Sequence, residues 1–315
     1  MSEIDVSARA ASLRIRRLRV GYAMATAAAA LFAVNGSVSK VILDEGELTA
    51  LRLTELRATG AALALAAFLA LAAPHRLRFR REELGILLLY GLVGFSLVQW
   101  LYFVAIERLP IGIARLLEFT APGLVALWAR LVWREPVRRR VWAALGLALG
   151  GLALVAEVWQ EARLNGVGVA AALIAAAALA TYFVAGEHAT SRRDPVSLLC
   201  LSLGVSALFW AAVQPWWSFP FGSLDETVPL GGALEGANAP VWALSAWMIV
   251  LGTILPFALS LGALRHLPAT RVSIIAMTEV VLGALVAWLW LGETLSAAQL
   301  VGGGVVLVGV ILAQT

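Results

Sequence analysis

Ten predominantly apolar stretches, separated by short connectors, dominate this chain of 315 residues. A helix needs about 20 apolar residues to cross the hydrocarbon core of a bilayer, and each stretch is close to that length. The stretches are residues 21–43, 49–73, 84–106, 110–132, 140–157, 166–187, 196–217, 240–263, 269–291 and 295–313. This pattern predicts an all-α integral membrane protein with ten transmembrane helices.

The composition excludes a water-soluble fold. Apolar residues make up 61% of the chain and charged residues 14%, whereas soluble proteins are about 25% charged. The net charge of +4 could suggest a nucleic-acid partner. However, the arginines fall in clusters between the apolar stretches, which is typical of cytoplasmic loops. We therefore expect a lipid bilayer, and not a nucleic acid, as the surrounding partner.

The distribution of arginines predicts the orientation. If the N-terminus is cytoplasmic, the cytoplasmic tail and loops hold 17 arginines and the opposite loops hold Arg108 and Arg163. The 17 are Arg9, Arg14, Arg16, Arg17, Arg19, Arg76, Arg78, Arg80, Arg81, Arg134, Arg138, Arg139, Arg140, Arg192, Arg193, Arg265 and Arg271. The positive-inside rule then predicts a multi-pass protein of the plasma (inner) membrane with both termini cytoplasmic. Residues 1–20 are expected to be a basic cytoplasmic tail.

The chain contains an internal repeat with an offset of 158 residues. Leu109-Pro110 aligns with Leu267-Pro268, and Glu135 aligns with Glu293. Over 109–135 and 267–293, nine of 27 positions are identical. Each copy, 21–157 and 158–315, holds five predicted helices, so the copies cross the membrane in opposite senses. Such inverted repeats are typical of secondary transporters.

Several short motifs occur along the chain, four in the first copy and two in the second. They are Phe32-Ala33-Val34-Asn35-Gly36-Ser37, Leu56-Arg57, Pro122, Arg134-Glu135, Glu279 and Gly292-Glu293-Thr294-Leu295. Together they resemble the EamA-type transporters of the drug/metabolite transporter superfamily, although Val280 stands where that family often has proline. The resemblance implies ten helices as an inverted five-plus-five repeat, a central cavity, and efflux or exchange of small metabolites, often amino acids.

Polar side chains inside the apolar stretches are the candidates for the pathway, because charges in a bilayer are costly. Glu279 is the deepest acid and is a candidate for contact with a substrate amine or for proton coupling; the alternative is a structural pair with an arginine. Glu118 and Arg57 lie at similar depths, and could pair with each other or hold a zwitterion together. Lys40, the only lysine, either lines the pathway or extends to the headgroups. Asn35 places an amide nearer the midplane.

Other residues have both a structural and a functional interpretation, and the structural one is favoured for the two arginines and the aromatic residues. Arg52 and Arg115 are expected to reach the surface or form ion pairs, with Glu55 as the i,i+3 partner of Arg52. Pro122 and Pro256 are expected to kink their helices and to free backbone carbonyls. Four interior aromatic residues either stack on a substrate or pack within the protein: Trp100, Tyr102, Trp247 and Trp288.

The sequence has no phosphate-binding loop and no catalytic or metal-ligand motif. His75, His188 and His266 lie in separate connectors, and Cys200 lies within an apolar stretch, where packing is its usual role. We therefore expect no cofactor, no metal and no enzymatic activity. The leading hypothesis is a secondary transporter that exports or exchanges a small polar solute, most readily an amino acid. The alternatives are an integral membrane enzyme and a non-transporting scaffold.

Overall fold

The computed structural model describes residues 3–160 and 164–314, with side chains from Ile15 onward. Arg163 and the side chains of Arg9 and Arg14, which entered the orientation count, lie outside this part. The first half contains α1 (Glu3–Glu45), α2 (Ala50–Ala72), α3 (Leu84–Leu89), the π-helical η3 (Tyr90–Leu97), α4 (Val98–Ile106), α5 (Ile111–Glu118), α6 (Ala121–Leu131) and α7 (Arg139–Val155).

The second half contains α8 (Gly166–Arg192), α9 (Pro195–Val213), β1 (Thr227–Pro229), β2 (Asn238–Pro240), α10 (Val241–Ile249), the π-helical η8 (Val250–Ile254), α11 (Leu255–Leu264), α12 (Ala269–Ala276), α13 (Thr278–Val286), the π-helical η9 (Ala287–Leu291) and α14 (Ala297–Gln314). The described part of the chain is therefore all-helical apart from a short antiparallel β-hairpin and brief 3-10 turns in the connectors.

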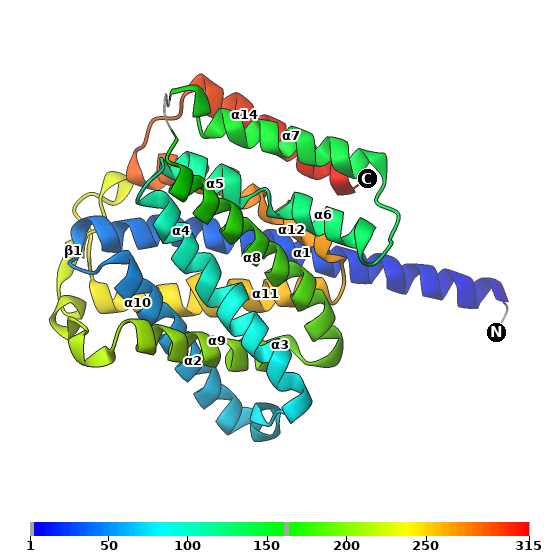
Figure 1. Ribbon diagram of the computed structural model, residues 1–315, viewed down its shortest axis with the longest axis horizontal. Helices are drawn as coiled ribbons and strands as arrows, with labels where there is room; N and C mark the ends of the chain where they lie inside the picture. Colours follow the sequence, from blue (N-terminus) through cyan, green and yellow to red (C-terminus); the bar gives the residue numbers. More distant parts are fainter. Residues whose placement is uncertain (1–2, 161–163, 315) are drawn as a thin grey trace.

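The membrane spans follow the ten predicted stretches. Within the described residues, nine helical segments are long and apolar enough to cross a bilayer. The stretch predicted at 140–157 forms α7, which has 17 residues and lies alongside α14 (Figure 1). The largest difference is at the start, because α1 is already helical at Glu3. The segment expected as a separate tail therefore continues the first membrane helix, which projects beyond the bundle (Figure 1).

The two ends of the bundle differ in charge. At one end, which we call the basic end, lie the connectors 73–83, 132–138, 193–194 and 265–268. Arg193 joins two of them by a 2.9 Å ion pair with Glu83 and by donating to the carbonyl oxygens of Arg76 and Arg78. Helix α1 begins and α14 ends toward this side (Figure 1). The opposite end, with connectors 46–49, 107–110, 214–240 and 292–296, contains the β-hairpin and is called the hairpin end.

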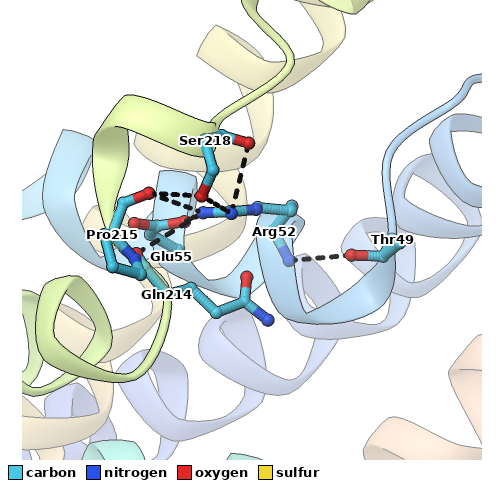
Figure 2. Close-up of polar contacts among 6 residues, drawn as sticks. All are labelled: Thr49, Arg52, Glu55, Gln214, Pro215 and Ser218. Carbon is cyan, nitrogen blue, oxygen red and sulfur yellow. Dashed lines mark hydrogen bonds and ion pairs between the residues drawn. The ribbon is translucent and has the colours of Figure 1, made fainter.

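At the hairpin end, Arg52 connects α2 to the segment that follows α9 (Figure 2). Its Nη1 donates to Glu55 at 2.6 Å, and its Nη2 donates to the Ser218 hydroxyl at 2.7 Å. It also donates to the carbonyl oxygens of Gln214 and Pro215, just beyond the last turn of α9. The predicted Arg52–Glu55 ion pair is thus confirmed, and Arg52 has a structural role.

The two halves are inverted copies, because contacts between them occur in equivalent pairs. Gly151 of α7 packs so tightly on α14 that a β-carbon there would lie 2.6 Å from the Gly302 carbonyl oxygen. Likewise, a β-carbon at Gly309 of α14 would lie 2.8 Å from the Ala144 carbonyl oxygen of α7. Under the offset of 158 residues, Gly151 becomes Gly309 and Gly302 becomes Ala144. The contact between α7 and α14 is therefore symmetric.

The first helices of the two halves, α1 and α8, obey the same symmetry with an offset of 147 residues. Gly21 of α1 lies against Leu267, and Gly168 of α8 lies against Leu109. Farther along, Asn35 of α1 packs on Gly252, and Tyr182 of α8 packs on Gly94. Each pair is converted into the other by exchanging the halves. An odd number of spans per half and this internal two-fold axis together give the inverted repeat.

Irregular turns also occur at equivalent places. The π-helical segments η3 and η8 contain Gly94 and Gly252, and in each a hydroxyl donates to the carbonyl oxygen five residues earlier: Ser96 to Gly91 at 3.0 Å and Thr253 to Met248 at 2.9 Å. The fourth span is broken after α5 at Phe119, and the ninth after α12 at the equivalent Met277. Pro122 lies in the first turn of α6 and Pro256 in the first turn of α11.

Candidate substrate-binding cavity

A cavity of about 770 Å³ lies between the two halves, enclosed by spans from both. It extends along α1 from Ala25 to Asp44 and reaches the surface at the hairpin end, where the side chains of Lys40 and Glu293 are 52% and 44% exposed. Its polar lining residues are Asn35, Ser37, Ser39, Lys40, Asp44, Thr54, Arg57, Gln99, Tyr102, Arg115, Glu118, Tyr182, Ser260, Glu279 and Glu293.

The cavity brings together all five polar residues proposed from the sequence. Arg57 comes from α2, Glu118 from the end of α5 and Glu279 from the first turn of α13, while Asn35 and Lys40 come from α1. Glu118 and Glu279 lie beside the two equivalent helix breaks. A carboxylate in the first turn of a helix is stabilised by the helix dipole, which favours Glu279 at this position.

Glu118 pairs with Arg115 and not with Arg57. The Arg115 Nη1 lies 3.0 Å from Glu118 Oε2, because the two residues are three apart on α5. The Arg115 guanidinium also lies 4.4 Å from the centre of the Tyr102 ring, within cation–π distance. Arg115 is surrounded by protein, yet 39% of its side chain is accessible because it faces the cavity.

Arg57 and Glu279 are the charges away from the exposed mouth of the cavity that stay unpaired. Neither forms a salt bridge within the described part of the chain, in which Arg115 is the partner of Glu118. Glu279 lies within electrostatic range of Arg115, Glu118 and Arg57. Away from the mouth, where Lys40, Asp44 and Glu293 lie, the cavity therefore holds two guanidinium groups and two carboxylates, of which one of each sign is available to a bound solute.

Two further polar groups of α1 differ in their surroundings. The Asn35 side chain is 6% exposed, and its Oδ1 is buried against Gly252 without a hydrogen-bond partner among the described residues. Lys40 Nζ lies 2.5 Å from Glu293 Oε1 at the cavity mouth, so this ion pair joins the first half of the chain to the second. Asn35 Oδ1 is thus an unused acceptor that is buried and not open to the cavity, whereas Lys40 already has a partner.

Of the aromatic and proline candidates, one lines the cavity and the others lie outside it. Tyr102 lines the cavity, but Trp100, Trp247 and Trp288 do not. Trp100 and Trp288 are 40% and 49% exposed on the outside of the bundle, and Trp247 packs in an apolar cluster. Pro122 and Pro256 shape the spans next to the cavity without lining it.

Sequence reasoning missed several members of the lining. Arg115 was expected to reach the surface or to form an ion pair; the ion pair is found, but its place in the cavity was not predicted, and Gln99, Tyr182 and Ser260 were not proposed. Tyr182 could have been found from the repeat, since it is equivalent to Asn35 once the 147-residue offset of the first helices is known. Within the described residues, no group of three His, Cys, Asp or Glu side chains could hold a metal ion.

Comparison with known proteins gives consistent matches. The model of the EamA-like transporter family matches twice, at residues 19–156 and 166–315. The threonine/homoserine exporter RhtA of Escherichia coli (strain K12) is 32% identical over 258 residues, covering 81% of this chain and 78% of that protein. The uncharacterized inner membrane transporter YicL of Salmonella typhimurium (strain LT2) is 26% identical over 296 residues, covering 90% and 92%.

A solved crystal structure has the same fold as this chain. It superimposes with a TM-score of 0.72 at 17% sequence identity, and covers 93% of this chain and 96% of its own. At that identity the likeness extends to the arrangement of the helices only.

Proposed function

Because the chain belongs to the EamA-like transporter family of the drug/metabolite transporter superfamily, we propose that it is a secondary transporter that exports a small zwitterionic amino acid. Membership in a transporter family removes the alternative of a membrane enzyme. The substrate would occupy the cavity between the inverted halves and reach each side of the membrane in turn, as in other inverted-repeat transporters.

The observation that carries the proposal is the unpaired Arg57 and Glu279 in one cavity. A charge away from bulk water is costly unless it finds a partner. The carboxylate of an amino acid would pair with Arg57, whose planar guanidinium binds carboxylates with two hydrogen bonds. The ammonium group would pair with Glu279. A substrate with both charges therefore satisfies both side chains, whereas a simple anion or cation would satisfy one.

The neutral part of the lining supports a polar substrate side chain. Gln99 and Ser260 place an amide and a hydroxyl in the cavity lining beside the charges. The similarity to a threonine/homoserine exporter points the same way, since both of those solutes carry a hydroxyl. At about 770 Å³ the cavity is in the upper part of the range of about 300–1,000 Å³ for small-molecule sites, so a small amino acid would bind together with water.

The basic end would face the cytoplasm, by the positive-inside rule. The cavity would then be open to the exterior, and both termini would be cytoplasmic in the plasma membrane. Two driving forces are compatible with the site: the outward gradient of the substrate itself, and exchange against protons carried by Glu279. Transport against a substrate gradient in vesicles with and without a proton gradient distinguishes them.

The proposal is tested by transport in proteoliposomes. Purified protein should exchange radiolabelled threonine or homoserine with an internal pool of the same amino acid. We expect Glu279→Gln and Arg57→Ala each to reduce the rate about tenfold or more, because each leaves one charge of the substrate unpaired. Trp288→Phe, on the outside of the bundle, should keep the parent rate. If a panel of amino acids were not moved while a control transporter was active, the proposed substrate class would be wrong.

A further inference from the structure

Equivalent positions at the two ends of the pathway carry different charges. At the hairpin end, Lys40 of α1 forms its ion pair with Glu293, which follows α13. Exchanging the halves converts Lys40 into Glu187 of α8, and Glu293 into Glu135, which follows α6. The basic end therefore has two acids where the hairpin end has an acid and a base.

The contacts next to these residues fix this correspondence. The Ser39 hydroxyl of α1 contacts the Met248 sulfur, at 3.9 Å. Its equivalent Gly186 of α8 faces the hydroxyl of Tyr90, which is itself equivalent to Met248. Glu187 and Lys40 are the next residues along α8 and α1, and Glu135 lies within electrostatic range of Glu187. Glu135 is thus the neighbour of Glu187 at the basic end that corresponds to Glu293 beside Lys40 at the hairpin end.

Glu187 accepts a hydrogen bond at the start of a helix that its counterpart Lys40 cannot accept. Its Oε2 accepts a hydrogen bond from the backbone N–H of Ala269, the first residue of α12, at 2.7 Å. The first N–H groups of a helix have no partner within the helix, so a carboxylate there acts as a cap. Lys40 carries only donors and cannot cap the equivalent Ile111 at the start of α5.

The basic end, where Glu187 caps α12, is also the end at which the cavity is closed. Ala269 is 0% exposed and α12 packs against α6, whereas Ile111 is 63% exposed and lines the cavity. On α6, Ala121 and Ala126 are fully buried; their equivalents on α13, Glu279 and Ala284, line the cavity. The contact between α6 and α12 therefore seals the basic end, while the equivalent contact between α13 and α5 is open.

Because the two halves share one fold, exchanging their conformations generates the state that is open at the basic end. In that state Glu187 would lose its bond to Ala269 and approach Glu135 as closely as Lys40 now approaches Glu293. Two carboxylates at that separation repel each other, whereas Lys40 and Glu293 attract. The cap that Glu187 makes on α12, its repulsion of Glu135, and the attraction between Lys40 and Glu293 thus all favour the state that is open at the hairpin end.

We propose that Glu187 is a positioning residue that keeps the basic end closed at rest, by capping α12 and by repelling Glu135 when that end opens. The proposal rests on alternating access in the proposed function, but not on the identity of the substrate. It predicts that Glu187→Lys gives the basic end the same pair of charges as the hairpin end. The introduced ammonium group cannot cap α12, and it would attract Glu135 in the state that is open at the basic end.

The test uses a matched pair of cysteines in a Cys200→Ser background, each labelled by a maleimide in purified protein without substrate. Ala126→Cys reports opening of the basic end, and the equivalent Ala284→Cys reports opening of the hairpin end. We expect Glu187→Lys to raise labelling at position 126 about fivefold and to lower it at position 284, from the loss of a charged cap and a new attraction. Lys40→Glu, which makes the hairpin end repulsive, should shift both positions in the same directions.

Restoring repulsion with Glu135→Lys in the Glu187→Lys protein should return both labelling rates toward the parent values. Unchanged labelling in Glu187→Lys, or a shift toward the hairpin-open state, would overturn the proposal. So would a rise at both cysteines that the second substitution does not reverse, because that indicates loosened packing. Transport of amino acids plays no part in this measurement, so its result and that of the transport assay are independent.

Discussion

The two deep acids of the cavity are chemically identical but have different surroundings. Glu118 is 4% exposed and bound to Arg115, which also lies over the Tyr102 ring. Glu279 lines the same cavity without a salt bridge within the described residues. Removing one partner of a buried ion pair leaves the other charge unsatisfied, whereas neutralising an unpaired acid removes a desolvation cost. The two acids should therefore respond in opposite ways to the same substitution.

We predict that Glu118→Gln lowers the free energy of unfolding by about 1–3 kcal/mol, the range for a pair whose arginine is partly accessible. Glu279→Gln should leave stability unchanged or raise it slightly, while reducing transport. Thermal unfolding of the detergent-purified variants, followed beside amino-acid exchange, separates the two effects. Equal destabilisation by both substitutions would show that Glu279 has a structural partner and would contradict its assignment to the substrate.

The elements of this fold could largely be predicted from the sequence, but their interruptions could not. Ten apolar stretches of bilayer length determine the spans, and the prolines at 122 and 256 mark two of the irregular sites. The break at Met277 has no proline, because Val280 occupies the position equivalent to Pro122. Only the equivalence of the halves indicates it. Likewise, Arg115 lies on α5, before the break at Phe119, and the apolar pattern of the sequence does not indicate its place in the cavity lining.

The pairing of α7 with α14 yields a prediction at the scale of elements. A β-carbon at Gly151 would lie 2.6 Å from the Gly302 carbonyl oxygen, so the two backbones would have to separate. We expect Gly151→Val to lower stability by about 1–3 kcal/mol, as overpacked interiors do. Gly150→Val is the matched control, because among the described residues no atom of another helix lies within 4 Å of a β-carbon there. Equal melting temperatures for the two variants would contradict the tight contact.

At the scale of the whole molecule, the repeat explains why the fold was predictable and its conformation was not. A period of 158 residues assigns the same structure to both halves, so it implies symmetry. The cavity exists because the halves differ: Ile111 is 63% exposed and its equivalent Ala269 is 0% exposed. Which end is open depends on small differences in charge and packing between equivalent residues, such as Lys40 and Glu187. The effect of those differences can be inferred only once the contacts of the equivalent residues are known.

The orientation of the molecule gives the last prediction. The basic end carries the arginine clusters, so it should face the cytoplasm, and the hairpin end should face the exterior. In a Cys200→Ser background, Glu235→Cys in the hairpin connector and Arg138→Cys before α7 are both exposed reporters. A membrane-impermeant maleimide added to intact cells should label position 235, and should label position 138 only after permeabilisation. The opposite result would place both termini outside and would turn the cavity toward the cytoplasm, in which case export would begin from the state described here.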